Sequence, residues 1–388
     1  MVYAVLVASA FLIEVAMNVP LGSLPLALVR MHVPAGEIAL VLGAGPIAAL
    51  LVSVPIGGLA DRFGRLPTIR IAACLCVLSV GMLAFVHDPL LIGLIMAIRG
   101  VAITAYVTAE FAYASAVVAP ERAVSATATL GMVGNLSFAT APAAGFWLWQ
   151  HGIEGEQFVW SAGVALAGAL ILSGLPAETM RAVRRSRKIF MRSVWLPAIT
   201  FLVACSLAGG VNGALAIVTF HQRGIANGAL LFTALASTTF ALRFFAGRLV
   251  DRFGPRQMAI PTAVAQCTGA LLAAHAHTPL AVVVAGLCMG IAWSAVVPVG
   301  IGLLFERSSP GTRGAAMGSY NLAFSIGMTA GSIVAAAAAA FGAGYTLAMS
   351  LCAAASLIAL PWLFLAGPAR PPRSLRPLLL LSHGSVRG

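Results

Sequence analysis

The sequence contains few charged residues. Its 23 Lys and Arg and 11 Asp and Glu make up 9% of 388 residues, whereas an ordinary soluble domain has about 25%. Hydrophobic residues make up 60% of the chain, and a membrane-spanning helix needs ~20 apolar residues. This composition excludes a soluble enzyme, a disordered chain and a nucleic-acid-binding module. It indicates a protein that crosses the membrane many times.

The sequence also lacks the patterns of several chemical sites. Its six cysteines fall inside apolar segments without metal or disulfide spacing, so we interpret them as small core residues. No Gly-rich Lys-Ser/Thr loop occurs, which argues against direct use of ATP. No set of nucleophile, base and metal ligands converges, so we expect no enzyme, no cofactor and no metal site. The start has no basic leader and no clear cleavage site, so we expect the first hydrophobic segment to stay.

Six of the seven histidines fall at predicted outer loops or helix ends, where a metal site, a pH sensor or plain solvated side chains are conceivable. We favour solvated side chains; the closest pair, His275 and His277, has no acidic or thiol companion nearby. The six are His32, His87, His151, His221, His275 and His277.

Twelve apolar segments, separated by polar or Pro/Gly breaks, run along the chain. They lie at about 3–29, 38–60, 67–86, 90–117, 122–149, 158–175, 194–220, 228–250, 257–274, 279–305, 315–341 and 343–366. One long hydrophilic break divides them into six and six. The predicted organisation is a six-helix bundle at 1–176, a basic linker at 177–192, a second bundle at 193–367 and a tail at 368–388. We therefore expect an all-α membrane protein with twelve transmembrane helices in two pseudo-symmetric bundles.

Basic residues are sorted by loop. With a cytoplasmic N-terminus, 19 of the 23 Lys and Arg fall on the inner side, as the positive-inside rule requires. Arg30 and Arg223 fall outside, and Arg99 and Arg243 lie within spans. We therefore expect a multi-pass protein of the cell membrane with both termini in the cytoplasm.

The two halves repeat each other. Residues 57–64 read Gly-Gly-Leu-Ala-Asp-Arg-Phe-Gly and residues 247–254 read Gly-Arg-Leu-Val-Asp-Arg-Phe-Gly, with six identities in eight positions, 190 residues apart. A second pair recurs near the same offset, at 120–122 and 310–313. Parallel repeats of this kind are typical of transporters that rock one half against the other around a midplane site.

At these loops the chain resembles the major facilitator superfamily over its whole length. The family's mark is a G-x-L-a-D-r-x-G-r-k loop between its second and third helices. The first copy departs from it at Leu66, where a basic residue is usual, and the second has Pro255 in place of the first basic residue. The matching residues are Gly57, Asp61, Arg62, Gly64 and Arg65 in the first copy and Gly247, Asp251, Arg252 and Gly254 in the second.

The chemistry of the loop suggests a conformational latch. Asp61 can sit against the positive end of a helix dipole from the opposite half, and Arg65 can pair with Glu121 in the neighbouring loop. Such contacts would hold the cytoplasmic side shut. The alternative is a turn that only stabilises the fold.

The fifth predicted helix has small residues at helical spacing, which let a facing helix approach closely. It resembles the antiporter signature of drug and small-molecule exporters in the superfamily, with Ala in two places where that signature has Gly. Export is therefore favoured, and ordinary packing in a membrane helix is the alternative. The packing residues are Gly131, Gly134, Pro142 and Gly145.

Ionisable residues inside the spans are functional candidates, because an uncompensated charge at mid-bilayer is costly. Glu14 lies near half depth with Asn18 one turn later, and Arg99 lies at a comparable level. The resemblance implies that the first and fourth helices line the central cavity. We hypothesise that Glu14 takes the proton and that Arg99 tunes it; a static buried pair is the alternative. Glu110, nearer the cytoplasm, is a second proton site or a gate residue.

Amides on other spans could line the cavity, with Tyr106, Trp293 and Tyr320 as possible aromatic walls. That cavity would be mostly apolar, which suits a hydrophobic or amphipathic solute. We interpret Arg243 as structural in the first instance, with a functional role left open. The cavity candidates are Tyr106, Asn135, Asn212, Trp293 and Asn321.

These inferences favour a secondary transporter that works by alternating access and exports a small hydrophobic or amphipathic compound in exchange for protons. Proton-coupled uptake or facilitated diffusion is the first alternative, and a membrane sensor or assembly partner that does not transport is the second. The expected partners are a small-molecule substrate, protons and the lipid bilayer, without nucleic acid. We expect a monomer.

Overall fold

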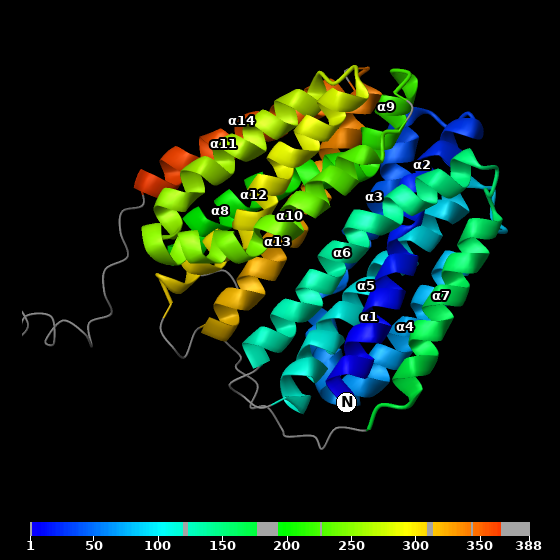
Figure 1. Ribbon diagram of the computed structural model, residues 1–388, viewed down its shortest axis with the longest axis horizontal. Coiled ribbons are helices and arrows are strands. Elements are labelled where there is room, and N and C mark those ends of the chain that lie inside the picture. Colours follow the sequence, from blue (N-terminus) through cyan, green and yellow to red (C-terminus); the bar gives the residue numbers. More distant parts are fainter. Residues whose placement is uncertain are drawn as a thin grey trace, which may run out of the picture.

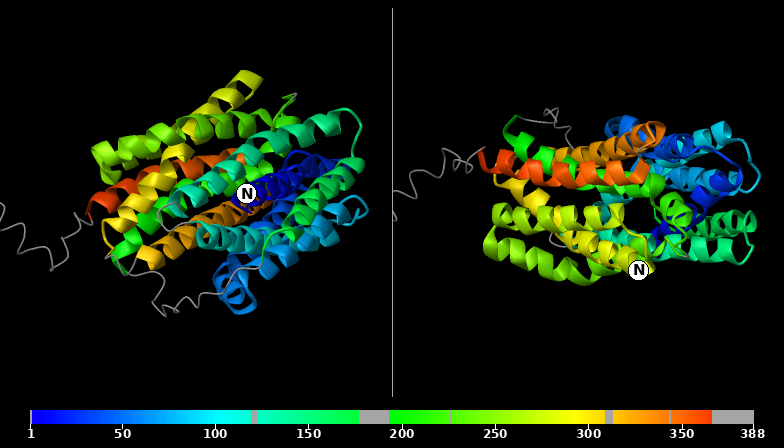
Figure 2. Two further views of the ribbon diagram at one scale, coloured as in Figure 1. Left: turned by 60° about the horizontal axis from the view of Figure 1, so that its bottom comes forward. Right: turned by 90° about the horizontal axis from the view of Figure 1, so that it is seen from above.

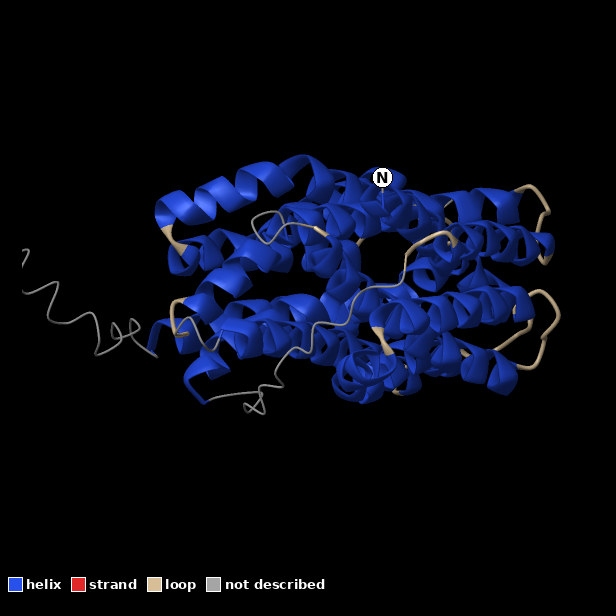
Figure 3. Cartoon of the chain, turned by 90° about the horizontal axis from the view of Figure 1, so that it is seen from below, coloured by secondary structure: helices blue, strands red, loops and turns tan. Residues whose placement is uncertain are grey.

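The computed structural model describes residues 2–118, 123–176, 193–225, 227–308, 313–342 and 344–365, and the regular structure in these ranges is helical throughout (Figure 3). The first half comprises α1 (Val2–Asn18), α2 (Pro20–Arg30), α3 (Ala35–Phe63), α4 (Arg65–Met82), α5 (Pro89–Val117), α6 (Ala123–Gln150) and α7 (Glu156–Ser173). The second half comprises a short 3-10 turn (Ser193–Trp195), α8 (Leu196–Val211), the π-helical turn η3 (Asn212–Ala216), α9 (Ile217–Gln222), α10 (Leu230–Phe253), α11 (Pro255–Ala274), α12 (Pro279–Phe305), α13 (Arg313–Ala340) and α14 (Gly344–Leu365).

These helices form twelve crossings. α1 and α2 make one span, and the stretch from the 3-10 turn to α9 makes another. Within the described ranges nine spans are long and apolar enough to cross a membrane, and α10, which bends by 57°, is a tenth. α6 and α11 run alongside the others and complete the twelve (Figure 1). The predicted fold of two six-helix bundles is therefore confirmed.

The repeat extends to the way in which helices begin. Asp88 caps α5 by accepting a hydrogen bond from the backbone N of Leu91 at 3.0 Å. Thr278, 190 residues later, caps α12 by accepting one from the backbone N of Ala281 at 3.2 Å. A proline follows each cap, and a proline in the first helical turn lacks only an N–H that would be unpaired there. The two halves therefore encode the same helix start, a capping residue followed by proline.

The two repeated loops also share one backbone conformation. Gly64, between α3 and α4, has φ 94° and ψ 147°, and Gly254, between α10 and α11, has φ 83° and ψ 151°. Side chains rarely tolerate positive φ, so glycine is required at both positions. The motif therefore encodes the same sharp turn in each half.

Two spans are irregular near the middle of the bundle. The first span breaks between α1 and α2, where Pro20 has no N–H to continue the helical ladder. The seventh span contains η3, a five-residue π-helical turn that begins at Asn212. Such turns concentrate at functional sites, and both lie next to predicted site residues.

The halves lie side by side, with α1–α7 on one side and α8–α14 on the other (Figures 1 and 2). We call the end at which α1 begins and α14 ends the terminal end, and the opposite end the distal end. α3 packs against α13, and α6 against α10. Near the distal end Thr329 donates a hydrogen bond to the backbone O of Pro46 at 2.9 Å, and the rings of Phe138 and Phe232 meet edge to face with centroids 5.6 Å apart.

Burial differs between the two ends. At the distal end a single buried cluster contains Leu26, Ala39 and Phe146 of the first half together with residues of α8–α14. Towards the terminal end the buried clusters described are separate, one built from residues 6–175 and the other from residues 195–363. The halves are therefore packed together at the distal end and parted at the terminal end.

Candidate functional site

Glu14 on α1 is the best placed of the predicted ionisable residues. Its side chain is 8% exposed, and no hydrogen bond or ion pair joins it to another described residue. The carboxylate lies against Gly134 of α6, where an added Cβ would come within 2.6 Å of Oε2. The carboxyl group is therefore buried without a basic or hydrogen-bonding partner among the described residues.

Arg99 on α5 does not pair with Glu14. Its guanidinium donates to the backbone O of Met17, the next-to-last residue of α1, and Nε has no partner among the described residues. The break at Pro20 frees carbonyl groups at this point in the first span, and Arg99 binds one of them. The arginine thus ties α5 to the broken first span, and no hydrogen bond or ion pair joins it to Glu14 in the described part of the chain.

Glu110 and Tyr106 lie one turn apart on α5 and are fully buried. Neither carboxylate oxygen of Glu110 has a hydrogen-bond partner in the described chain, and the group is close enough to Glu14 for the two to interact electrostatically. Tyr106 shares a hydrogen bond with Ser9 of α1 at 3.4 Å. The first half thus encloses two carboxyl groups that pair with no basic residue in the part of the chain that the structure describes.

The small residues of α6 face the first span. An added Cβ on Gly145 would lie 2.2 Å from the backbone O of Val19, and one on Gly22 would lie 1.9 Å from the backbone O of Pro142. Gly131, by contrast, faces open space. The close approach therefore joins α6 to α1 and α2 of its own half.

The predicted amides have different surroundings. Asn212 is 2% exposed and is used within the second half, where Tyr345 Oη donates to its Oδ1 at 2.6 Å and its Nδ2 approaches Met289 Sδ at 3.6 Å. Asn18 is half-buried beside Glu14, and Asn321 on α13 is exposed. The side chain of Asn135 lies outside the part that the structure describes.

An aromatic group surrounds Arg243 in the second half. Trp293 of α12 meets Phe324 of α13 edge to face at 5.8 Å, and Tyr320 stacks on Phe324 at 6.4 Å. Arg243 of α10 donates to the backbone O of Trp293 at 3.4 Å and interacts electrostatically with Tyr320. Gly209 of α8 leaves room for the indole, since an added Cβ would come within 2.8 Å of Trp293 Cζ2. Sequence reasoning named Arg243, Trp293 and Tyr320 separately but missed Phe324 and the contacts among them, because their proximity depends on the rotation of three helices.

The loops of the latch motif tie neighbouring helices together. Arg65 donates to the backbone O of Ala112, near the end of α5, at 3.0 Å. In the second half Arg256 pairs with Glu306, at the end of α12, at 3.5 Å. Each contact joins the helix after the loop to the next one.

The remaining latch residues lie at the terminal end. The guanidinium groups of Arg62 and Arg252 lie over the rings of the phenylalanines that follow them, at 5.6 and 5.4 Å. Asp251 is exposed, and Gly247 has open space around it. Glu121 lies outside the described residues, as do the surroundings of Gly57 and the side chain of Asp61.

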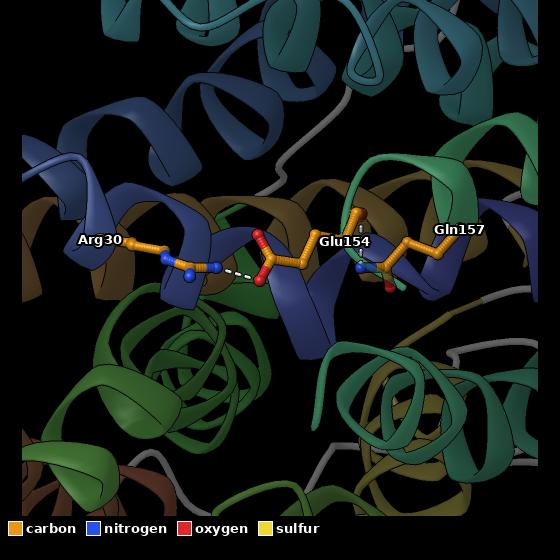
Figure 4. A network of polar contacts seen from close by, with 3 residues as sticks. All are labelled: Arg30, Glu154 and Gln157. Carbon is orange, nitrogen blue, oxygen red and sulfur yellow. Dashed lines mark hydrogen bonds and ion pairs between the residues drawn. The ribbon is translucent and has the colours of Figure 1, made fainter. Parts of the chain in front are cut away.

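The distal end carries a cavity between the halves. It encloses about 670 Å³ between α2, α6 and the end of α9, and its lining includes Trp149, Ile225 and the exposed His221. At its rim Arg30 pairs with Glu154 (Figure 4). The Arg30 guanidinium also lies over the ring of Trp149, 5.9 Å from its centroid.

Hydrogen bonds fix the loops around this cavity. The Gln157 amide donates to the backbone O of Glu154 at 2.8 Å (Figure 4). Arg223, just after α9, donates to the backbone O atoms of Ala274 and Ala276 and to Thr346, and burial lowers the pKa of its guanidinium from the usual value. Packing therefore closes the distal end, and hydrogen bonds hold its loops in both halves. No group of three or more potential metal ligands occurs in the ranges that the structure describes.

Comparisons with known proteins place this arrangement among transporters. A sequence model of the Major Facilitator Superfamily matches residues 6–227 and 198–381. An uncharacterized MFS-type transporter of Bacillus subtilis, YfkF, is 27% identical over 177 residues, which span 43% of this chain and 44% of that protein. The matched part is therefore less than half of the relative's length.

Solved structures show the same fold. The crystal structure of the nucleoside transporter NupG aligns over 94% of this chain and 98% of that chain, with a TM-score of 0.76 and 16% identity. A bacterial homologue of the human lysosomal transporter Spinster, in an inward-facing and occupied conformation, aligns over 96% and 98%, with a TM-score of 0.77 and 16% identity. The human organic anion transporter MFSD10 aligns over 93% and 98%, with a TM-score of 0.70 and 17% identity.

Proposed function

Because the chain belongs to the Major Facilitator Superfamily, and is thus a multi-pass membrane transporter of a small molecule rather than an enzyme, we propose that it exports an amphipathic compound in exchange for protons. The observation that carries the proposal is the Glu14 carboxylate. It is buried, lacks an ion-pair partner among the described residues and lies against Gly134 of α6, one turn from Gly131, which faces open space.

The proposed cycle uses competition at one group. With the distal end open, Glu14 takes a proton and loses its attraction for a donor or cationic group of the substrate. With the terminal end open to the cytoplasm, the proton leaves and substrate binds to the carboxylate. The terminal end would be cytoplasmic because its loops carry most of the basic residues. The conformation described here, parted at that end, would then be the one that accepts substrate from the cell.

The other charged residues support this role. Glu110, deeper in the first half and electrostatically coupled to Glu14, would hold the proton on its way to the terminal end. Arg99 would keep the two segments of the first span in register through its bond to Met17 while Glu14 changes charge. The latch loops would engage when the terminal end closes, and the single chain would suffice as a monomer.

Proton flux in proteoliposomes tests the proposal. Purified protein is reconstituted with a pH-sensitive dye inside and challenged with pooled amphipathic compounds, wild type beside Glu14→Gln. We expect compounds to drive proton movement in the wild type and not in the variant. Glu37→Gln, an exposed carboxylate in the first turn of α3, is the matched control. Equal substrate transport by wild type and Glu14→Gln, with no proton movement in either, would replace the proposal with facilitated diffusion.

A further inference from the structure

Three hydrogen-bond donors converge in the middle of the second half. The Arg243 guanidinium lies beside Trp293 and within electrostatic reach of the Tyr320 hydroxyl. The indole Nε1 of Trp293 is buried and has no partner in the described chain. Buried donors in folded proteins are normally paired. The group therefore has unused capacity to bind an acceptor.

No carboxylate of a described residue pairs with the Arg243 guanidinium. Its single hydrogen bond within the described residues is the 3.4 Å contact to the backbone O of Trp293, whereas a guanidinium carries five N–H donors. Asp251 lies eight residues further along α10, ~12 Å at 1.5 Å per residue, and is exposed. Glu306 at the end of α12 is paired with Arg256. An arginine inside a membrane span without an acidic partner is costly, and an anionic group supplied by a ligand would offset that cost.

The walls around Arg243 fit an aromatic group. Trp293, Phe324 and Tyr320 present both edges and faces of rings within one cluster, and aromatic ligands bind such walls edge to face or offset-stacked. Trp293, Phe324 and Arg243 all retain partial exposure. Gly209 of α8 lies against one side of the indole, so the exposed surface of the cluster lies on its other sides. This partial exposure leaves the cluster accessible to a ligand.

We propose that Arg243, Trp293 and Tyr320 form the recognition site for a carboxylate carried by an aromatic substrate. The proposal rests on the proposed function, in which Glu14 of the first half receives a cationic or donor group. Taken together, the two halves define the substrate class as aromatic zwitterions, with the carboxylate directed to the second half. Arg243 then contributes specificity, and Glu14 contributes proton coupling.

A structural role for Arg243 makes a different prediction. If its bond to Trp293 only ties α10 to α12, its removal lowers the stability of the fold and affects all substrates alike. A recognition role affects substrates according to whether they carry a carboxylate. The test must therefore compare matched compounds rather than a single one.

The probes are phenylalanine and 2-naphthylalanine, each as the free amino acid, its methyl ester and its N-acetyl derivative. Binding to purified protein is measured by calorimetry for wild type, Arg243→Gln and Arg243→Lys, with thermal unfolding as a check on the fold. Arg248→Gln is the matched control, since Arg248 lies on the same helix and is exposed.

We expect the wild type to bind at least one free acid about 10- to 100-fold more tightly than its ester, because charged hydrogen bonds contribute about 1.5–3 kcal/mol. Arg243→Gln should bind acid and ester equally, with the ester unaffected. Arg243→Lys should keep part of the preference, since it retains the charge but loses the planar fork. Trp293→Phe, which keeps a ring but removes the N–H, should lower the preference several-fold.

Equal binding of acid and ester by the wild type, or failure of every free acid to bind, overturns the proposal. So does an equal loss of acid and ester affinity in Arg243→Gln. Failure of the proposed function has a separate signature, because it concerns Glu14: the amine and its N-acetyl derivative would then bind equally while the preference for acid over ester survives.

Discussion

The two halves of the bundle share their turns but differ in their charged interiors. Gly64 and Gly254 have nearly the same backbone angles, and matching caps begin α5 and α12. Inside the membrane, the first half encloses Glu14 and Glu110, whereas the second half places Arg243 among aromatic rings. Backbone geometry restrains the turns in both copies, while mid-depth side chains are free to differ. Under the proposed mechanism, each half would have a separate task, proton binding in one and substrate recognition in the other.

The largest expected effect is on substrate-driven proton movement, and one assay separates the roles of Glu14 and Arg243. Glu14→Gln should lower substrate-driven proton movement at least 100-fold, because the protonatable group is gone. Arg243→Gln should leave proton movement intact when the substrate is an ester and lower it about tenfold for the free acid. Proton flux into dye-loaded proteoliposomes measures both. If Arg243→Gln also abolishes proton movement with esters, the division of tasks between the halves is wrong.

Crowding of the Glu14 carboxylate should have the next largest effect. A Cβ on Gly134 would come within 2.6 Å of Oε2, and since that oxygen ends a flexible side chain, it can move aside without unfolding the helices. Gly134→Ala should therefore lower proton-coupled transport about tenfold with little change in the thermal unfolding midpoint. Gly163→Ala on α7, where an added Cβ meets nothing within 4 Å, is the control. Equal transport by both variants would show that the position of Glu14 is not critical.

A third comparison uses one buried, unpaired polar group from each half. Glu110 on α5 and Gln266 on α11 are fully buried, and their side-chain polar atoms lack partners among the described residues. Glu110→Met and Gln266→Met should each stabilise the protein by about 1–3 kcal/mol, the usual cost of an unsatisfied buried group. Denaturation curves in detergent and transport assays are run on both. Only Glu110→Met should slow proton-coupled transport, and an unchanged rate would remove Glu110 from the proton path.

The smallest effect tests the shared turns. Gly64→Ala and Gly254→Ala should each destabilise the fold by about 1–2 kcal/mol, because a side chain at positive φ is strained. The two losses should be equal within error, as measured by thermal unfolding. A loss confined to one variant would mean that the two turns are restrained differently despite their matching angles.

The sequence was sufficient to predict the twelve spans and the repeat, because hydrophobic runs and turn residues are local signals. Pro20 could have located the break in the first span, since proline interrupts the helical ladder. The π-helical turn at Asn212 has no such marker. The type of secondary structure could therefore be predicted from the sequence where single residues determine it.

Contacts within the site were less accessible to sequence reasoning. Glu14 and Arg99 have matching depths, yet Arg99 binds the backbone of Met17. Asn212 was expected in the cavity, and its amide contacts Tyr345 and Met289 within its own half. Depth follows from counting residues along a helix, but partners follow from how each helix is rotated against its neighbours. That rotation is fixed by packing across the whole bundle.

The matching angles of Gly64 and Gly254 also bear on how this chain could have arisen. A gene duplication produces two identical copies, and substitutions then accumulate wherever a side chain can be exchanged. At a positive φ almost every exchange is strained, so these two glycines change last. The eight-residue motif around them thus preserves a trace of common ancestry, while the interiors of the two copies have diverged.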